Sequence, residues 1–455
     1  MTERTRARVA NAELGAPMPI LGDPHPGPKT AVLHALYDLM WCVGLLVGSP
    51  WWIVRSLLDA RFRAMVADRL TLSLPRFDPA RPRVLVHGVS VGEVKGAAPL
   101  VRALLEREPG LEVVISVTTA TGLEVARKTY PNLTVVRYPL DLSLVTRRFL
   151  RALQPRAVVL MELEVWPNFL RSCNRAGAPV AVVNGRITPR SFERYRLFRH
   201  TLPQFDRISI FCVQGEDYAE RFRGLGAAPE RVIVTGNMKA DGLKIGAVTP
   251  KAELVRLLSA PTGTPVIVAG STHRPEEKLV ASAWLAGARD ARLVLVPRHP
   301  DRATEVLGDL ATLGLTGQLL TKLRAGTETA DPRLPAIVDT IGELESVYAL
   351  SDLVYVGGSL LPHGGQNMLE PAAQGRAVVY GPHVHNFAQE AALLESAGAS
   401  RRVADEVELG NVFRELLADP PARARMGASG LEVVAAQKGA TALTLEALVR
   451  RCLVS

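Results

Sequence analysis

The stretch "HGGQNMLEP" at residues 363–371 places two glycines, two side-chain amides and a carboxylate close together. Gly364 and Gly365 would let the backbone approach a ligand, and a helix starting near Asn367 would offer free N–H groups to a phosphate. Glu370, one turn further on, could then accept hydrogen bonds from vicinal hydroxyls such as those of a ribose. Helix capping is the alternative, with Asn367 as the N-cap and Glu370 serving only the helix dipole.

Three glutamates follow strand-like runs in the first half of the chain. Glu93 ends "HGVSVGE", and Glu162 and Glu164 lie in "MELEVWPN". Each alone fits a carboxylate at the start of a helix. Together they would lie on the rim of one parallel sheet, where a general base for a hydroxyl group is needed.

Two turns in the second half have the residue types that bind phosphate. "AGSTHRPEE" starts at Ala269 and brings Ser271 directly after a strand-like run, with backbone N–H groups and a hydroxyl available to an anion. "PRHP" follows the next run with Arg298 and His299. Alone these would be unremarkable surface residues, but beside such a turn they are candidate nucleotide contacts.

Apolar runs of strand length, separated mostly by stretches long enough for helices, must position these residues. They lie at 83–89, 111–117, 133–139, 156–161, 179–184, 207–213 and 231–236, and again at 265–270, 291–297, 336–340, 352–358 and 376–381. Strands that are apolar throughout indicate parallel sheets covered on both faces. We therefore predict an α/β fold with two Rossmann-like domains, 80–241 and 265–440, joined by a linker at 242–264 and followed by a C-terminal helix at 441–455. Such sheets bind ligands at the carboxyl ends of their strands, here in the cleft between the domains.

Composition supports a globular chain of two domains. It has 455 residues, of which 47% are hydrophobic and 22% charged. Four scattered cysteines have no metal-ligand spacing and favour a reducing compartment. The net charge of +9 indicates an acidic partner. With 5% aromatic residues and no nucleic-acid-binding motif, an anionic lipid surface is favoured over nucleic acid.

An uncharged run at 39–54, "LMWCVGLLVGSPWWIV", supports a lipid partner. Its tryptophans suit a membrane interface, whereas Pro50 and its length argue against a simple span; a buried core helix is the alternative. We predict a membrane-associated segment at 31–70 after a polar extension at 1–30. Because the candidate chemistry begins beyond residue 80, we expect a chain without residues 1–58 to fold and remain catalytic.

Eight stretches together resemble one known family. They are "HGVSVGE", "MELEVWPN", "NGRITPRSFERY", "GNMKAD", "AGSTH", "PRHP", "VGGSLLPHGGQNMLEP" and "GPHVHNF", in this order. This order is typical of 3-deoxy-D-manno-octulosonic acid (Kdo) transferases, and the resemblance covers roughly residues 80–440. Gln366 departs from the histidine, and Met368 from the proline, that many members have.

The resemblance implies a GT-B glycosyltransferase fold that needs no cofactor or metal. It implies a cytidine monophosphate Kdo (CMP-Kdo) donor, a lipid A precursor as acceptor, and a place on the cytoplasmic face of the inner membrane. Glu93 would be the catalytic base, with Glu162 beside it on the acceptor side. Donor binding would fall to Ser271, Arg298, Gly364, Gly365, Asn367 and Glu370.

The acceptor's phosphates call for basic side chains, and "RITPRSFERYRLFRH" supplies five arginines. Arg186 and Arg190, nearest the strand end, are the candidates; for Arg194, Arg196 and Arg199 a solvated helix face is an equal alternative. Two other functions compete with glycosyl transfer. A sugar-nucleotide epimerase with the same architecture would not need a membrane segment, and a non-catalytic membrane-binding protein would not need carboxylates at strand ends.

Overall fold

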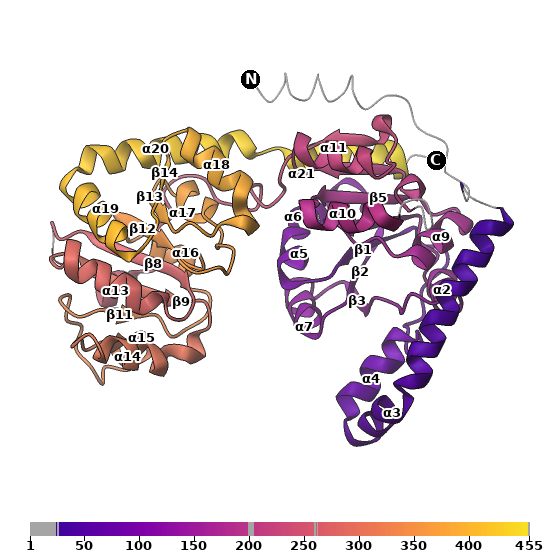
Figure 1. The fold of residues 1–455 in the computed structure, drawn as a ribbon, viewed down its shortest axis with the longest axis horizontal. Coiled ribbons are helices and arrows are strands. Elements are labelled where there is room, and N and C mark those ends of the chain that lie inside the picture. Colours follow the sequence, from indigo (N-terminus) through magenta and orange to yellow (C-terminus); the bar gives the residue numbers. More distant parts are fainter. Residues whose placement is uncertain (1–23, 25–26, 199–203, 259–260, 262, 454–455) are drawn as a thin grey trace. The chain divides into compact units, whose positions relative to one another are not determined.

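The computed structural model describes residues 24, 27–198, 204–258, 261 and 263–453. The chain forms two compact units. Unit 1 comprises residues 1–242 and 438–455, and unit 2 comprises residues 243–437. Each unit is built around its own sheet (Figure 1).

Unit 1 contains a seven-stranded parallel sheet in the order β3-β2-β1-β4-β5-β6-β7. Its strands are β1 (Arg83–Gly88), β2 (Glu112–Val117), β3 (Thr134–Arg137), β4 (Ala157–Met161), β5 (Val180–Gly185), β6 (Ile210–Val213) and β7 (Val232–Val234). The central strands are buried on both faces, which explains their continuous apolar sequence. The carboxyl ends of all seven strands meet at one edge, and Glu93, Glu162 and Glu164 follow strands there.

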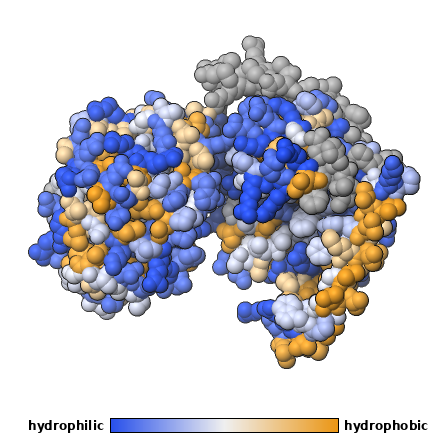
Figure 2. Space-filling view, viewed as in Figure 1, coloured by the Kyte–Doolittle hydropathy of each residue, from blue (hydrophilic) through white to orange (hydrophobic). Residues whose placement is uncertain are grey.

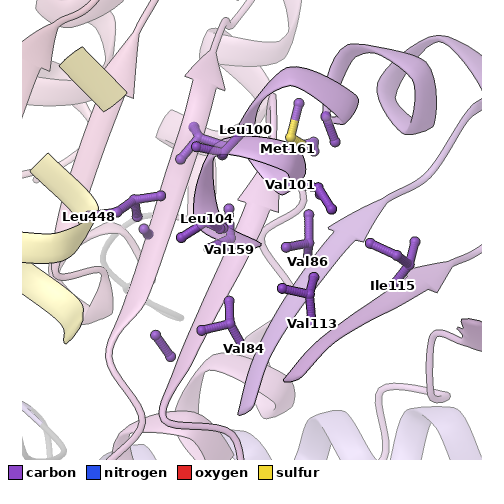
Figure 3. Packing of buried hydrophobic residues seen from close by; sticks show 14 of the residues in the cluster. Val84, Val86, Leu100, Val101, Leu104, Val113, Ile115, Val159, Met161 and Leu448 are labelled. Atoms are coloured by element: carbon purple, nitrogen blue, oxygen red, sulfur yellow. The ribbon is translucent and has the colours of Figure 1, made fainter. Parts of the chain in front are cut away.

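Helices cover both faces of this sheet. They are α5 (Val91–Gly96), α6 (Ala98–Arg107), α7 (Ala120–Thr129), α8 (Ser143–Leu153), α9 (Pro167–Arg175), α10 (Pro189–Phe198), α11 (Glu216–Gly224) and α21 (Ala440–Leu448). Figure 3 shows Leu100 and Leu104 of α6 packed over Val84, Val86 and Val159 of the sheet. The C-terminal α21 returns to this unit and adds Leu448 to the same core, followed by a helical turn at Val449–Leu453.

Three helices precede the sheet of unit 1: α2 (Pro28–Val47), α3 (Ser49–Leu58) and α4 (Ala60–Arg69). The uncharged run at 39–54 is therefore divided between two helices: α2 ends before Gly48, and α3 starts at Ser49 with Pro50 in its first turn. Large apolar side chains of α2 and α3 are exposed (Figure 2). They are Val32, Leu36, Leu39, Met40, Val43, Leu46, Val47, Trp51, Ile53, Val54, Leu57 and Leu58.

Unit 2 repeats the architecture with a second seven-stranded parallel sheet, in the order β10-β11-β9-β8-β12-β13-β14. Its strands are β8 (Val266–Thr272), β9 (Arg292–Pro297), β10 (Gln318–Leu319), β11 (Ala336–Ile337), β12 (Leu353–Val356), β13 (Ala377–Tyr380) and β14 (Ser400–Arg402). Its helices are α12 (Ala252–Leu258), α13 (Glu276–Gly287), α14 (Ala303–Ala311), α15 (Leu320–Arg324), α16 (Leu344–Tyr348), α17 (Leu369–Ala373), α18 (Ala388–Ser396), α19 (Glu406–Ala418) and α20 (Pro420–Gln437).

The predicted class, α/β with two parallel sheets, is confirmed, and each of the twelve apolar runs contains a strand. Part of the stretch interpreted as a linker is packed instead: Leu254 and Leu258 of α12 are fully buried in the core of unit 2. The spacing of these leucines places them on one helical face, so the segment from residue 243 onwards belongs to unit 2.

Candidate active site

Glu93 lies at the rim of the unit 1 sheet, in the first turn of the helix that follows β1. Ser90 is the N-cap of α5, and its hydroxyl donates to Oε1 of Glu93 at 2.9 Å. Oε2 of Glu93 accepts from the backbone N–H of Val89, also at 2.9 Å. "SVGE" thus forms a variant of a capping box, which fixes the carboxylate on the rim.

Burial raises the pKa of Glu93, and the negative charge of Glu162 adds to this effect. The N–H of Val89, the hydroxyl of Ser90 and the charge of Lys239 oppose it. A carboxylate with a raised pKa is a better proton acceptor than an ordinary one. Capping and basicity are therefore compatible in the same side chain.

Glu162 follows β4 in a left-handed backbone conformation, with φ of +57°. A non-glycine residue rarely adopts this conformation, which is found most often where a site constrains the chain. Both carboxylate oxygens are paired: Arg186 donates to Oε2 at 2.6 Å and Lys239 to Oε1 at 3.0 Å. Glu162 therefore holds two basic side chains at the rim of the sheet.

Glu164 is the third carboxylate of this rim. The indole N–H of Trp166 donates to Oε2 of Glu164 at 2.7 Å. Burial raises the pKa of Glu164 to about 7, with the hydrogen bond from Trp166 opposing and the charge of Glu93 assisting the rise. The structure thus brings Glu93, Glu162 and Glu164 into one electrostatic cluster, and Glu164 titrates near neutral pH.

The arginines of the "RITPRSFERYRLFRH" stretch divide into two groups. Arg186 is bound to Glu162, as described above. Arg190, Arg194 and Arg196 are exposed on α10, and Arg196 pairs with Glu193 at 2.7 Å. Arg199 lies outside the described residues. Arg186 alone among the described members of this stretch is held beside the rim carboxylates.

In unit 2, Ser271 and Arg298 lie at the carboxyl ends of the neighbouring strands β8 and β9. Ser271 has φ of +55°, a second left-handed non-glycine residue at a strand end. The backbone N–H of Arg298 donates to Thr272 O at 2.9 Å, while its side chain is exposed. Both residues are therefore on the rim where a parallel sheet binds ligands.

The two glycines of "HGGQN" are required by the backbone. Gly364 and Gly365 have φ of +94° and +80°. A Cβ on Gly364 would lie 2.2 Å from Nδ2 of Asn386 and 2.7 Å from Nε2 of His385, so a larger residue would displace these side chains. A side chain at Gly364 would therefore be crowded by these neighbours and strained by the left-handed backbone.

Asn367 and Glu370 are hydrogen-bonded to each other at the start of helix α17. Nδ2 of Asn367 donates to Oε1 of Glu370 at 3.0 Å, and its Oδ1 accepts from the N–H of Leu369 at 3.2 Å. Helix α17 begins at Leu369, and its N-cap is Met368 rather than Asn367. Asn367 accepts from the first N–H of the helix, and Glu370, inside the helix, accepts from the Asn367 amide.

Sequence reasoning missed Glu276, the first residue of α13, which is fully buried. Its carboxylate accepts from the hydroxyl of Tyr355 and from four backbone N–H groups at 2.6–3.0 Å. The four are those of His273, Gly358, Ser359 and Leu360. Glu276 thus ties the loop after β8 to the loop after β12. Two adjacent glutamates at the start of a helix gave no sign in the sequence that both are buried.

Histidines gather on the same rim of unit 2. The rings of His273 and His363 are stacked with centroids 4.7 Å apart, and the ring of His299 lies 6.0 Å from that of His273. Nε2 of Gln366 is 3.2 Å from Nε2 of His273. Burial lowers the pKa of His273, and the neighbouring His363 lowers it further. Within the described residues, no group of three or more His, Cys, Asp or Glu side chains could hold a metal ion.

The sequence is similar to that of known glycosyltransferases. Residues 61–242 match the family model of 3-deoxy-D-manno-octulosonic-acid transferase (kdotransferase). A 3-deoxy-D-manno-octulosonic acid transferase of Bordetella pertussis is 35% identical over 448 residues, covering 93% of this chain and 98% of that protein.

Solved structures share the fold at low identity. A glycosyltransferase of Rickettsia africae superposes with a TM-score of 0.56 at 12% identity, covering 81% of this chain and 96% of that chain. UDP-GlcNAc 2-epimerase of Neisseria meningitidis gives a TM-score of 0.55 at 14% identity, covering 81% and 100%. The predicted GT-B fold class is confirmed, but because an epimerase has the same fold, the fold does not select the reaction.

Proposed function

This chain belongs to the family of 3-deoxy-D-manno-octulosonic acid transferases, which makes it a glycosyltransferase, and we propose that it transfers Kdo from CMP-Kdo to a lipid A precursor, lipid IVA. The family membership supports the transferred sugar. The observation that carries the finer proposal is the cluster of Glu93, Glu162 and Glu164 on one rim, since transfer to a hydroxyl requires a base where the acceptor binds.

In the proposed step, Glu93 accepts the proton of the acceptor hydroxyl. The acceptor oxygen then attacks the anomeric carbon of Kdo, the bond from that carbon to the phosphate oxygen breaks, and CMP leaves with the bonding electrons. Attack opposite the leaving group inverts the configuration. The hydrogen bonds that Glu93 accepts from Val89 and Ser90 leave lone pairs on both oxygens for a substrate hydroxyl.

Glu162 has a different role in this proposal from the catalytic one predicted. Because each of its oxygens is paired with a basic side chain, whereas Glu93 is held only by its own turn, we give the proton-accepting role to Glu93. It instead orients Arg186 and Lys239, whose positive charges suit a phosphate of the acceptor. Arg190, exposed on α10, would add a second, more loosely held basic group.

Unit 2 would bind the donor. Ser271, Gly364 and Gly365 offer a hydroxyl and close backbone approach to the phosphate, and Arg298 offers a positive charge to the CMP leaving group. Asn367 and Glu370 would exchange their mutual hydrogen bond for bonds to the ribose hydroxyls. A nucleoside monophosphate leaving group can be stabilised by such groups.

We further propose that α2 and α3 attach the protein to the cytoplasmic face of the inner membrane. Helix α2 is long and apolar enough to cross a membrane by length and composition. Its exposed apolar side chains continue across the break into α3, where Leu57 and Leu58 are 73% and 83% exposed. A surface of this kind is typical of helices that lie in a lipid interface.

The test is an assay of the purified full-length protein in detergent, with CMP-Kdo generated in the reaction and tetraacylated lipid IVA. We expect a product heavier by one or more Kdo residues and stoichiometric release of CMP. An epimerase would instead interconvert UDP-GlcNAc without any lipid, and a membrane-binding protein would do neither. Failure to modify lipid IVA in a preparation that binds CMP would overturn the proposed acceptor.

A further inference from the structure

We propose that helix α2 is a structural part of the acceptor site, in which His34 and Asp38 position the "WPN" turn and, through it, Glu164. The inference rests on the proposed function for the importance of Glu164. The contacts that carry it lie within unit 1.

One face of α2 is polar although the rest of the helix is apolar. His34, Tyr37 and Asp38 are spaced i, i+3 and i+4, so they share one face of the helix. His34 is 1% exposed, whereas Leu36 and Met40, on the opposite side, are 55% and 60% exposed. The polar face is therefore the one that packs against the domain.

The polar face of α2 is hydrogen-bonded to Asn168, the last residue of "WPN". Nδ1 of His34 lies 2.7 Å from Oδ1 of Asn168. Nδ2 of Asn168 donates to Oδ1 of Asp38 at 2.7 Å and to the backbone oxygen of Asp141 at 2.9 Å. Because both amide hydrogens face these oxygens, Oδ1 of Asn168 is the acceptor, and Nδ1 of His34 carries the proton. Asn168 is 1% exposed, so these partners replace water.

Two carboxylates complete the junction by capping helices. Oδ1 of Asp38 accepts from the N–H of Ser143, the first residue of α8, at 2.9 Å. Asp141 accepts from the N–H groups of Asn168 and Phe169, in the first turn of α9, at 3.2 and 2.7 Å. First-turn N–H groups have no partner within their own helix, and a buried one without a partner is costly. Asp38 of α2 thus accepts from the first N–H of α8, and Asp141, in the loop before α8, accepts from the first N–H groups of α9.

A short covalent path joins this junction to the rim carboxylates. Asn168 follows Trp166 and Pro167 directly, and the fixed φ of proline leaves little freedom between them. Trp166 in turn donates to Glu164. A displacement of Asn168 is therefore passed to the hydrogen-bond partner of Glu164.

This role reverses the expectation that residues 1–58 are dispensable. Their deletion removes His34 and Asp38, and it leaves the amide of Asn168 and the N–H of Ser143 without these partners. The helix whose outer face would contact lipid is the same helix whose inner face organises the acceptor site. Membrane attachment and acceptor recognition are then coupled through one rigid element.

The test compares three full-length variants in detergent: His34→Ala, His34→Asn and Lys29→Ala. The amide of Asn can donate from nearly the position of Nδ1, so His34→Asn is the conservative rescue, and Lys29→Ala, at an exposed charged residue of the same helix, is the control. We expect His34→Ala to raise KM for lipid IVA or lower kcat by about tenfold, with CMP affinity unchanged. His34→Asn should regain most of this loss, and Lys29→Ala should be close to wild type.

Hydrogen exchange of the segment 161–170 is measured in the same proteins and does not depend on turnover. We expect faster exchange there in His34→Ala and protection restored in His34→Asn. Unchanged exchange at 161–170, or a uniform increase throughout unit 1 that His34→Asn does not correct, would overturn the positioning role. Absence of turnover in the wild type would overturn the proposed function alone, because the exchange comparison still decides the role of His34.

Discussion

Glu93 and Glu276 occupy corresponding places in the two units. Each lies in the first turn of the helix that follows the first strand of its sheet, which is β1 in unit 1 and β8 in unit 2. Glu276 is fully buried and accepts five hydrogen bonds that join two loops. Glu93 is only partly buried and accepts two, both from its own turn.

The difference is what we expect if one topological position serves structure in unit 2 and, in the proposed function, chemistry in unit 1. A carboxylate that organises a loop needs all its acceptor capacity inside the protein. A carboxylate that accepts a substrate proton needs a lone pair and an open side, together with a raised pKa. The predictions below separate these two conditions, starting with the largest expected effect.

Glu276→Gln should destabilise unit 2 by at least about 3 kcal/mol, because the amide nitrogen cannot accept from backbone N–H groups that remain buried. Urea unfolding monitored within unit 2 measures this. Glu415→Gln is the control, since Glu415 forms an exposed pair with Arg401 and its replacement should change stability by less than about 1 kcal/mol. Equal stability of the two variants would contradict the structural role of Glu276.

Gly364→Ala should weaken CMP binding by about tenfold or more while leaving the fold of unit 2 intact. Alanine at this position would have to adopt a left-handed backbone conformation, and its Cβ would displace Asn386 and His385. Both effects move the loop that precedes Asn367. Calorimetric titration with CMP provides the measurement. Gly342→Ala offers a control with the same backbone strain but no nearby atoms, at φ of +87°. If both variants bind CMP as wild type does, the loop is not part of the donor site.

Glu370→Gln should weaken CMP binding by roughly tenfold, the loss typical of a hydrogen bond to a charged group. Deoxycytidine monophosphate sharpens this test. If Glu370 binds the ribose hydroxyls, the substitution should matter less for the deoxynucleotide than for CMP. An equal loss for both nucleotides would limit Glu370 to its hydrogen bond with Asn367.

Glu164 should make unit 1 less stable as pH rises from about 4.5 to about 7. Its pKa is raised from 4.5 to about 7, so the folded protein binds more protons than the unfolded chain in this window, and stability falls as pH increases. Glu164→Gln should remove a decrease of the order of 1 kcal/mol, an amount reduced by solvent screening of a partly exposed group. A pH dependence of unfolding identical to that of wild type would place the titration elsewhere.

The sequence predicted the architecture because parallel strands buried on both faces leave a continuous apolar signature. It missed β10 and β14, which are edge strands of two and three residues, and "SRR" of β14 has no apolar pattern at all. The motifs were correctly placed after the carboxyl ends of strands, the edge where parallel sheets commonly bind ligands.

Hydrogen-bond partners that are distant along the chain could not be predicted from motifs and apolar runs. His34 and Asn168 are separated by 134 positions, and neither residue type suggests the other. The spacing of His34, Tyr37 and Asp38 on an otherwise apolar helix was the available signal, since a lipid-facing helix has little use for a polar stripe. The burial of Glu276 left no comparable signal, because its partners are backbone groups.

The most direct test of the account is Glu93→Gln, with turnover on lipid IVA and CMP affinity measured on the same preparation. Glutamine keeps the size and one acceptor of the cap but cannot take the proton of the acceptor hydroxyl. We expect turnover to fall by about a hundredfold to ten-thousandfold and CMP affinity to stay within twofold of wild type. Turnover near the wild-type level would contradict the account, and would make Glu93 a capping residue and Glu164 the carboxylate to test as the base.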